Sequence, residues 1–229
     1  MKALVFDAGP IISLTINNLL WLIPELKKRF GGEFYITNAV KKELVETPLK
    51  SKKFKFEAIQ VQQLIENDIL KIISDSKIKK KAEKLANLAN SCFFVHNHKM
   101  KAVHAGEMET LAAAIELDIE VIVVDERVTR MFIERPLEIE RRFEKKLHSD
   151  VKVDKGKLRK FHSLVSHLKL IRSIELATVA YEHGLLDRYL VKIPNAKKIL
   201  IESVLWALKL NGCSITDEEI EDIVRTVNK

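Results

Sequence analysis

The sequence predicts an α/β domain with a mostly parallel central sheet, followed by an all-helical C-terminal region. Two observations support this fold class. Short apolar runs alternate with helix-length periodic segments over about the first 150 residues, and only helix-like segments follow. Strands that alternate with helices favour a parallel sheet covered by helices on both faces. We therefore expect an α/β domain over residues 1–150 and a helical extension over residues 151–229.

The strand-like runs are short, apolar and partly β-branched, as buried strands usually are. They are Leu4–Phe6, Phe34–Ile36, Ile69–Ile73 and Glu120–Val124. The segments between them have the apolar spacing and the length of helices. These segments are Ile11–Arg29, Ala39–Val45, Phe56–Glu66, Ile78–Ala89 and Met108–Leu117.

The C-terminal region contains four further helix-like segments, at residues 157–171, 173–186, 195–212 and 216–229. Gly212 fits the C-cap of the third, and Thr216 with Glu219 forms a capping box that opens the fourth. Their apolar stripes must be covered. We expect them to pack on the α/β domain or to form a homodimer, in preference to binding RNA through Lys155, Lys157, Arg159 and Lys160.

Composition excludes several classes of protein. The chain has 229 residues with 47% hydrophobic side chains, which is unlike a disordered or fibrous protein. Cys92 and Cys213 lie far apart without zinc-finger spacing, so neither a disulfide framework nor a structural zinc site is expected. The start of the chain is unlike a signal peptide and no apolar run is long enough to span a membrane. We expect a cytoplasmic protein without a membrane partner.

The charge balance favours a polyanionic partner. The net charge is +7, and lysines concentrate in two basic patches, residues 41–55 and residues 77–101. A basic surface attracts phosphate groups, although many basic proteins bind no nucleic acid.

Two of the predicted strands end at an aspartate. Asp7 closes the first and Asp125 closes the fourth. In an open parallel sheet, ligands bind outside the carboxyl ends of the strands. Each aspartate by itself fits a helix N-cap equally well.

Two glutamates sit where they can join these aspartates. Glu43 lies about one turn into the second helical segment, and Glu107 lies at the start of the helix that follows Gly106. Singly, Glu43 fits a solvated helix face and Glu107 fits a charge at the positive end of a helix dipole. Together, four carboxylates repel one another and require a cation. Hard oxygen ligands suit Mg²⁺ or Mn²⁺.

The chain resembles the PIN-domain ribonucleases. The matching stretches are FDAGPIISL with Asp7, TNAVKKELVE with Glu43, HAGEMETLAAA with Glu107 and VIVVDERVTRMF with Asp125, within residues 1–135. The resemblance implies a three-layer α/β/α fold. It also implies that these four acids hold divalent metal ions that activate water to cut RNA, which makes them the catalytic and metal-binding residues of a ribonuclease, an endonuclease by preference.

The chain departs from the family in several places. Val123 stands where many members have a Thr or Ser, and the third acid is Glu107, with Glu109 nearby in a secondary role, where Asp is common. The basic insertion at residues 74–103 and the helical extension make the chain look most like an archaeal subgroup. The alternative to a ribonuclease is a catalytically inactive PIN-like protein that binds RNA or serves as a scaffold.

Other residues are candidates for substrate binding: Ser13, Lys79, Lys80 and Lys81. Ser13 equally fits a hydrogen bond to an acid or a local helix cap, and the three lysines fit a solvated helix face. A toxin with an antitoxin-like protein partner and an RNA-processing enzyme both remain open.

Two rival enzymes with a strand-terminal Asp are disfavoured. Phosphatases of the haloacid dehalogenase type need a second Asp where this chain has Gly9, and the residues of a response-regulator receiver cannot be placed.

Overall fold

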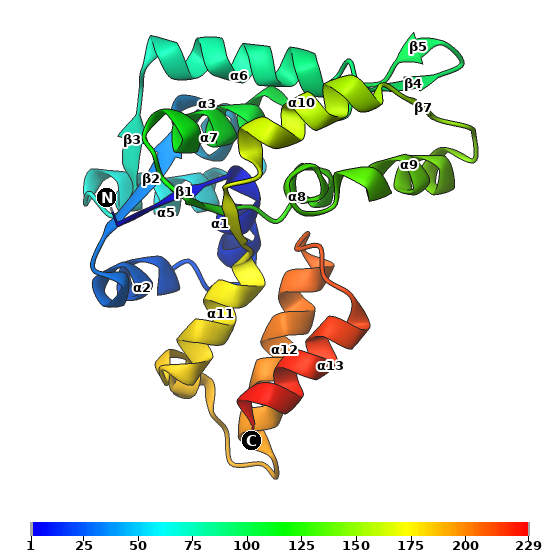
Figure 1. Ribbon diagram of the computed structural model, residues 1–229. Helices are drawn as coiled ribbons and strands as arrows, with labels where there is room; N and C mark the ends of the chain where they lie inside the picture. Colours follow the sequence, from blue (N-terminus) through cyan, green and yellow to red (C-terminus); the bar gives the residue numbers. More distant parts are fainter. Residues whose placement is uncertain (1, 229) are drawn as a thin grey trace.

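The computed structural model describes residues 2–228 and has a five-stranded sheet at its centre (Figure 1). The strand order is β3-β2-β1-β6-β8, and every neighbouring pair is parallel. The strands are β1 (Ala3–Phe6), β2 (Glu33–Thr37), β3 (Lys71–Ile73), β6 (Val121–Val123) and β8 (Lys169–Ile171). The predicted mostly parallel sheet is confirmed.

Alternate residues of β1 enter two separate cores. Leu4 and Phe6 pack into one cluster, and Ala3 and Val5 pack into the other. Successive side chains of a strand point to opposite faces, so each face of the sheet has its own layer of helices. The result is the three-layer arrangement that the resemblance implied.

The helices divide between the two cores. The core that contains Phe6 includes residues of α1 (Ala8–Ile16), α2 (Leu22–Phe30), α5 (Lys55–Glu66), α11 (Ser173–Glu182), α12 (Ala196–Leu210) and α13 (Asp217–Val227). The core that contains Val5 includes residues of α6 (Ser76–Ala89), α7 (Ala105–Glu116), α8 (Arg127–Glu134), α9 (Ile139–Leu147) and α10 (Lys155–Val165).

Shorter elements complete the chain. After β2 come α3 (Asn38–Lys41), a π-helical turn η1 (Lys42–Glu46) and α4 (Thr47–Leu49), and single 3₁₀ turns are η2 (Pro136–Glu138) and η3 (Leu185–Tyr189). The second sheet is antiparallel, with the order β5-β4-β7. Its strands are β4 (Phe93–Val95), β5 (His98–Lys99) and β7 (Lys152–Val153).

The helix expected over Ile11–Arg29 is two helices. α1 ends at its C-cap, Asn17, and Asn18 has a φ of 55°, in the left-handed region. Asparagine enters this region more easily than most residues, so the chain can leave the helix here at little cost. The chain resumes as α2 at Leu22.

The C-terminal region is mainly helical, but it also supplies two strands that the apolar spacing did not indicate. Residues 169–171 belong to a segment expected to be one helix; α10 instead ends at Val165, and β8 pairs with β6. The open edge of β6 offers backbone hydrogen bonds that a strand can satisfy. The expected boundary near residue 150 stays a prediction, and residues on both sides of it share this sheet.

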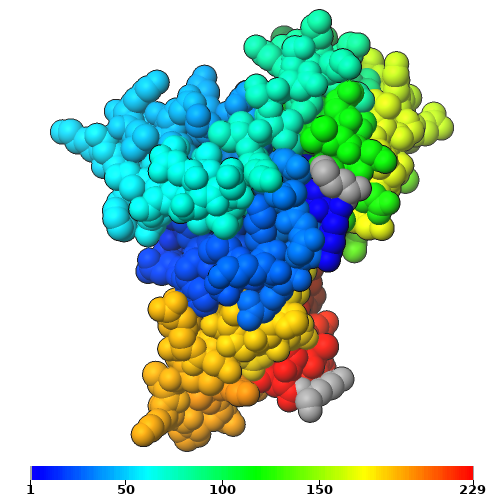
Figure 2. All heavy atoms as spheres, turned by 90° about the vertical axis from the view of Figure 1, so that its left-hand side faces the viewer, coloured from blue at the N-terminus to red at the C-terminus, as the bar shows by residue number. Residues whose placement is uncertain are grey.

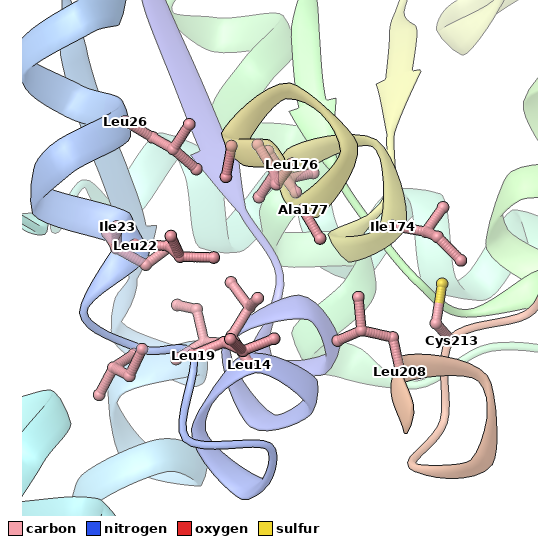
Figure 3. Close-up of a cluster of buried hydrophobic side chains, with 14 of the residues drawn as sticks. Leu14, Leu19, Leu22, Ile23, Leu26, Ile174, Leu176, Ala177, Leu208 and Cys213 are labelled. Atoms are coloured by element: carbon pink, nitrogen blue, oxygen red, sulfur yellow. The ribbon is translucent and has the colours of Figure 1, made fainter. Parts of the chain in front are cut away.

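The C-terminal helices pack back onto the α/β domain. In Figure 3, Leu176 and Ala177 of α11 lie toward the apolar side chains of α1 and α2, and Leu208 of α12 lies beside Leu14. Figure 2 shows the same arrangement at the surface, with the yellow, orange and red segments adjoining the blue N-terminal ones. The apolar stripes of the extension are thus largely covered within one chain.

No helix within residues 2–228 is both long enough and apolar enough to cross a membrane.

Candidate carboxylate site

Asp7 lies at the junction of β1 and α1. Its backbone N–H donates to Val123 O on the neighbouring strand at 2.9 Å, and its carboxylate caps α1. The side chain is 6% exposed. Burial raises the pKa of Asp7 to about 7, and the negative charges of Glu107 and Glu43 contribute to the rise against the backbone amides of Ala8 and Gly9. Asp7 is therefore poised to hold a proton or a cation.

Glu107 lies in the first turn of α7. Its Oε2 accepts hydrogen bonds from the backbone N–H of His104 and from Oγ1 of Thr129, each at 3.1 Å. Burial raises the pKa of Glu107, and the charge of Glu126 adds to the rise, although the hydrogen bonds oppose it. The two donors fix the direction of this carboxylate.

Glu43 belongs to the π-helical turn η1, and its carboxylate lies near the first turn of α7. Its side chain is exposed, and its Oε2 lies 3.7 Å from the position that a Cβ atom at Gly106 would occupy. That position is in the first turn of α7, where the helix dipole favours a negative charge. Isolated π-helical turns often occur at functional sites, because the extra residue redirects a side chain.

The three carboxylates form one electrostatic cluster, although they come from three separate elements. The charges of Glu107 and Glu43 both raise the pKa of Asp7. Within residues 2–228, neither Asp7 nor Glu43 forms an ion pair with a basic side chain. The structure thus brings together three of the four predicted acids.

The fourth acid, Asp125, is turned toward the C-terminal region. It is 2% exposed, and both of its carboxylate oxygens accept hydrogen bonds. Oδ1 accepts from the backbone N–H of Ser173 at 2.8 Å; Oδ2 accepts from the hydroxyls of Ser173 at 2.7 Å and Ser13 at 2.9 Å. The prediction that Asp125 is a metal ligand stays a prediction, and these contacts favour a supporting role.

Ser13 contacts the fourth acid, Asp125. The residue is 2% exposed, and its hydroxyl donates a hydrogen bond to Asp125. The hydrogen bond to an acid that the sequence allowed for Ser13 is present, and a contact of Ser13 with substrate stays a prediction.

Glu109 takes no part in the cluster. Its Oε1 accepts the backbone N–H of Ala39 at 3.1 Å, at the start of α3. Its expected secondary role agrees with this position, since a helix turns residues 107 and 109 to different sides.

The three candidate lysines lie on α6. Lys79 lines a hollow with Ala105 and Glu109 of α7, and Lys81 forms an ion pair with Glu116 at 2.5 Å. Lys80 is exposed. Their expected role in binding RNA stays a prediction.

Three side chains that contact or influence the candidate acids were not predicted from the sequence. Thr129 orients Glu107, Ser173 binds Asp125, and Glu126 adds negative charge near Glu107. Thr129 follows Asp125 by one helical turn, which is a usable signal. No local sequence signal identifies Ser173, because it is 48 residues away from Asp125. Hydroxyls at positions 13 and 173 contact Asp125 even though position 123 is a valine.

The loop after α12 contacts α8 and the residue before α11 through Ser214. The backbone oxygen of Ser214 accepts hydrogen bonds from Arg130 of α8 at 2.8 Å and from Arg172 at 3.2 Å. Beside it, burial and the neighbouring Asp125 raise the pKa of Cys213 to about 12, so this thiol stays neutral.

The donor set suits a hard divalent cation. Asp7, Glu43 and Glu107 offer only carboxylate oxygens, which Mg²⁺ and Mn²⁺ prefer, and a cation would relieve their repulsion. Among residues 2–228, no group of three or more His, Cys, Asp or Glu residues is already arranged to hold a metal ion. The three carboxylates fit a divalent cation in their chemistry. Because the Glu43 side chain is exposed, it has the freedom to complete the set of ligands.

The comparison with protein families identifies the family of the chain. A family model described as a PIN domain matches residues 3–136, more than half of the chain. This chain belongs to the PIN-domain family. Asp7, Glu43, Glu107 and Asp125 all fall within the matched PIN region, whereas β8 and Ser173 lie beyond it.

PIN domains are generally nucleases, so the family places this chain in a nuclease superfamily. No curated protein and no solved structure matches the chain.

Proposed function

We propose that this PIN-domain protein is a divalent-metal-dependent ribonuclease that hydrolyses phosphodiester bonds within RNA. One observation carries the proposal: Asp7 is buried at the end of β1 with its pKa raised to about 7, beside Glu107 and Glu43. Such a shift at a sheet's carboxyl edge is typical of a functional site. The PIN match over the same residues supplies the reaction class.

Asp7, Glu43 and Glu107 would hold Mg²⁺ or Mn²⁺ in this proposal. When bound, the cation polarises the phosphate and lowers the pKa of bound water. The protein's own contribution is to keep the three carboxylates close despite their repulsion. Thr129 and the backbone N–H of His104 orient Glu107, and the cap on α1 orients Asp7.

Asp125 positions the strand ends in this proposal. Its carboxylate ties β6 to α1 through Ser13 and to α11 through Ser173. A Cβ atom at Gly9 would lie 3.5 Å from Cβ of Asp125 and 3.6 Å from Oδ2 of Asp7. Asp125 and Asp7 therefore both lie next to Gly9. Buried hydrogen bonds to a charged group are among the stronger ones, which suits a positioning role.

RNA is the proposed substrate because the chain carries +7 net charge and two lysine-rich stretches. We also propose an antitoxin-like protein and a second copy of the chain as partners. The alternative is a PIN-like protein that binds RNA without cutting it. The lack of a preassembled metal group within residues 2–228 is the observation that keeps this alternative open.

Metal binding and cleavage together test the proposal. The full chain is incubated with a labelled single-stranded RNA in Mg²⁺, Mn²⁺, Ca²⁺ or EDTA, and thermal unfolding is followed in the same buffers. Cleavage in Mg²⁺ or Mn²⁺, with a rise in melting temperature on adding metal, is the expected result. RNA binding without cleavage and without a metal-induced shift would favour the inactive alternative.

A further inference from the structure

An apolar groove adjoins the carboxylate cluster on the side of α5. It lies between α1, η1, α4 and α5, and its walls are almost entirely apolar. The wall residues include Ile12, Leu44, Pro48, Phe54 and Val61. Glu43 also lines the groove, so one side chain belongs both to this groove and to the cluster around Asp7.

Phe54 stands at this groove in an uncommon backbone conformation. Its φ is 65°, in the left-handed region, and its side chain is 43% exposed. A bulky residue adopts this conformation at an energetic cost, and such costs concentrate at binding and catalytic sites. Phe56 and Ile59 nearby in sequence are also exposed, at 69% and 49%. These two side chains are exposed on other faces of α5 and do not line the groove.

The segment that carries Phe54 is strongly basic. Residues 50–56 read KSKKFKF, with four lysines and no acid. All four lysines are exposed, and none forms an ion pair with any residue in the described range 2–228. The Lys53 ammonium lies 4.6 Å from the centre of the Phe54 ring. In Figure 2 the light-blue segment around these residues projects from the body of the molecule.

Aromatic side chains interleaved with free cations are the usual way in which proteins hold single-stranded nucleic acid. Bases stack on the rings, and the cations bind the backbone phosphates. We infer that this groove binds an unpaired base of single-stranded RNA, with Phe54 stacking on the base and Lys50, Lys52, Lys53 and Lys55 binding the adjacent phosphates. The inference rests on the proposed function, because it takes RNA as the substrate and Glu43 as the link to the site of cleavage.

Charge favours RNA over a second copy of this chain as the occupant. A two-fold dimer through the groove would bring two lysine-rich segments together, and the chain already carries +7. A polyanion instead gains from every lysine. The position of Glu43 places the captured base next to the phosphate that the carboxylates would act on.

The test measures the affinity of the full chain for a short labelled single-stranded RNA in EDTA, where cleavage cannot occur. We expect Phe54→Ala to weaken binding roughly ten-fold, since one base stack is removed, and Phe54→Tyr to bind as the unchanged protein does. A matched abasic RNA should weaken binding to the unchanged protein and abolish the effect of Phe54→Ala. The control is Leu137→Ala, which removes another apolar side chain, 75% exposed, outside the groove.

Salt dependence separates the roles of the ring and the lysines. Phe54→Ala should leave the slope of log affinity against log salt unchanged, whereas Lys52→Ala with Lys53→Ala should reduce it by roughly 0.7 for each phosphate that is no longer neutralised. Equal affinities of Phe54→Ala and Leu137→Ala for RNA would overturn the inference. A change from dimer to monomer in Phe54→Ala, with RNA binding unaltered, would overturn it too and assign the groove to self-association.

The inference and the proposed function can fail separately. A chain that binds RNA in a Phe54-dependent manner but cuts none in Mg²⁺ or Mn²⁺ keeps the groove and loses the nuclease. A chain that cuts RNA with the same KM and affinity after Phe54→Ala keeps the nuclease and loses the groove.

Discussion

Ser173 binds Asp125 with both its backbone and its side chain. The N–H donates to Oδ1 at 2.8 Å and the hydroxyl donates to Oδ2 at 2.7 Å, although the two residues are 48 positions apart. The PIN match ends at residue 136, before Ser173. A part of the chain outside the family's matched region therefore holds one of the four acids in place.

Ser173→Ala is expected to destabilise the fold by about 1–3 kcal/mol, because it leaves a buried carboxylate oxygen with one donor fewer. Chemical denaturation measures the change. The matched control is Ser163→Ala, which removes an exposed hydroxyl bonded to the backbone of its own helix and should change stability by less than about 0.5 kcal/mol. Equal effects of the two substitutions would mean that the Asp125 contact contributes nothing.

Asp7→Asn is expected to abolish RNA cleavage while the fold remains intact. The substitution removes a charge from three carboxylates that repel one another, so the apo protein gains stability as it loses metal affinity. Glu109→Gln is the control, because Glu109 caps α3 and lies outside the cluster, and its effect on cleavage should be much smaller. Full activity of Asp7→Asn at saturating Mn²⁺ would remove Asp7 from the site.

The stability of the metal-free protein is expected to fall as the pH rises. Asp7 titrates near 3.8 in the unfolded chain and near 7 in the folded one. Between these values the unfolded chain releases a proton that the folded chain keeps, so the contribution present below pH 4 is lost by about pH 7. The loss is on the order of 2–4 kcal/mol.

Urea denaturation in EDTA at pH 5 and pH 8 measures this dependence. Asp7→Asn should lack the part of the pH dependence that comes from Asp7. The free energy of unfolding of the variant should therefore rise relative to that of the unchanged protein as the pH rises. A constant difference between the two proteins across this range would contradict the raised pKa.

Two truncations should behave differently. Removing residues 151–229 takes away β8, which covers the edge of β6, and α11, which packs on α1 and α2. We expect this fragment to lack cooperative unfolding. Removing residues 191–229 keeps both elements and the Ser173 contact, so this fragment should unfold cooperatively at a lower temperature. Circular dichroism and calorimetry distinguish them, and a cooperative 1–150 fragment would support an independent domain there.

Neutralising Lys79, Lys80 and Lys81 to Gln is expected to weaken RNA binding and to flatten its salt dependence, by roughly 0.7 in log-log slope for each phosphate that these lysines neutralise. The matched control neutralises Lys192, Lys197 and Lys198, which are exposed near the start of α12 at the opposite end of the molecule from α6 (Figure 1). Identical changes in both triple variants would reduce the effect to net charge alone.

The sequence by itself predicted the alternation of strands and helices, and it predicted that Asp7 and Asp125 end strands and that Glu107 lies at the start of a helix. These features are local, because apolar spacing and residue type act over a few positions. They were enough to place Asp7 at the end of β1 and Glu107 at the start of α7, and the structure confirms both positions. The alternation also predicted the parallel sheet with helices on both faces. The resemblance added the PIN family, which the family match confirms.

Only the tertiary structure decided which acids meet. Asp125 follows its strand as Asp7 does, yet its oxygens are bound by Ser13 and Ser173, while the exposed Glu43 approaches Gly106. Residues 169–171 read as helix but form a strand, because the open edge of β6 offers hydrogen bonds that local preference cannot register. Residues that contact each other but lie far apart in sequence leave no periodic signal. The groove beside Glu43 and the hydrogen bonds to Asp125 therefore exist only in the folded chain.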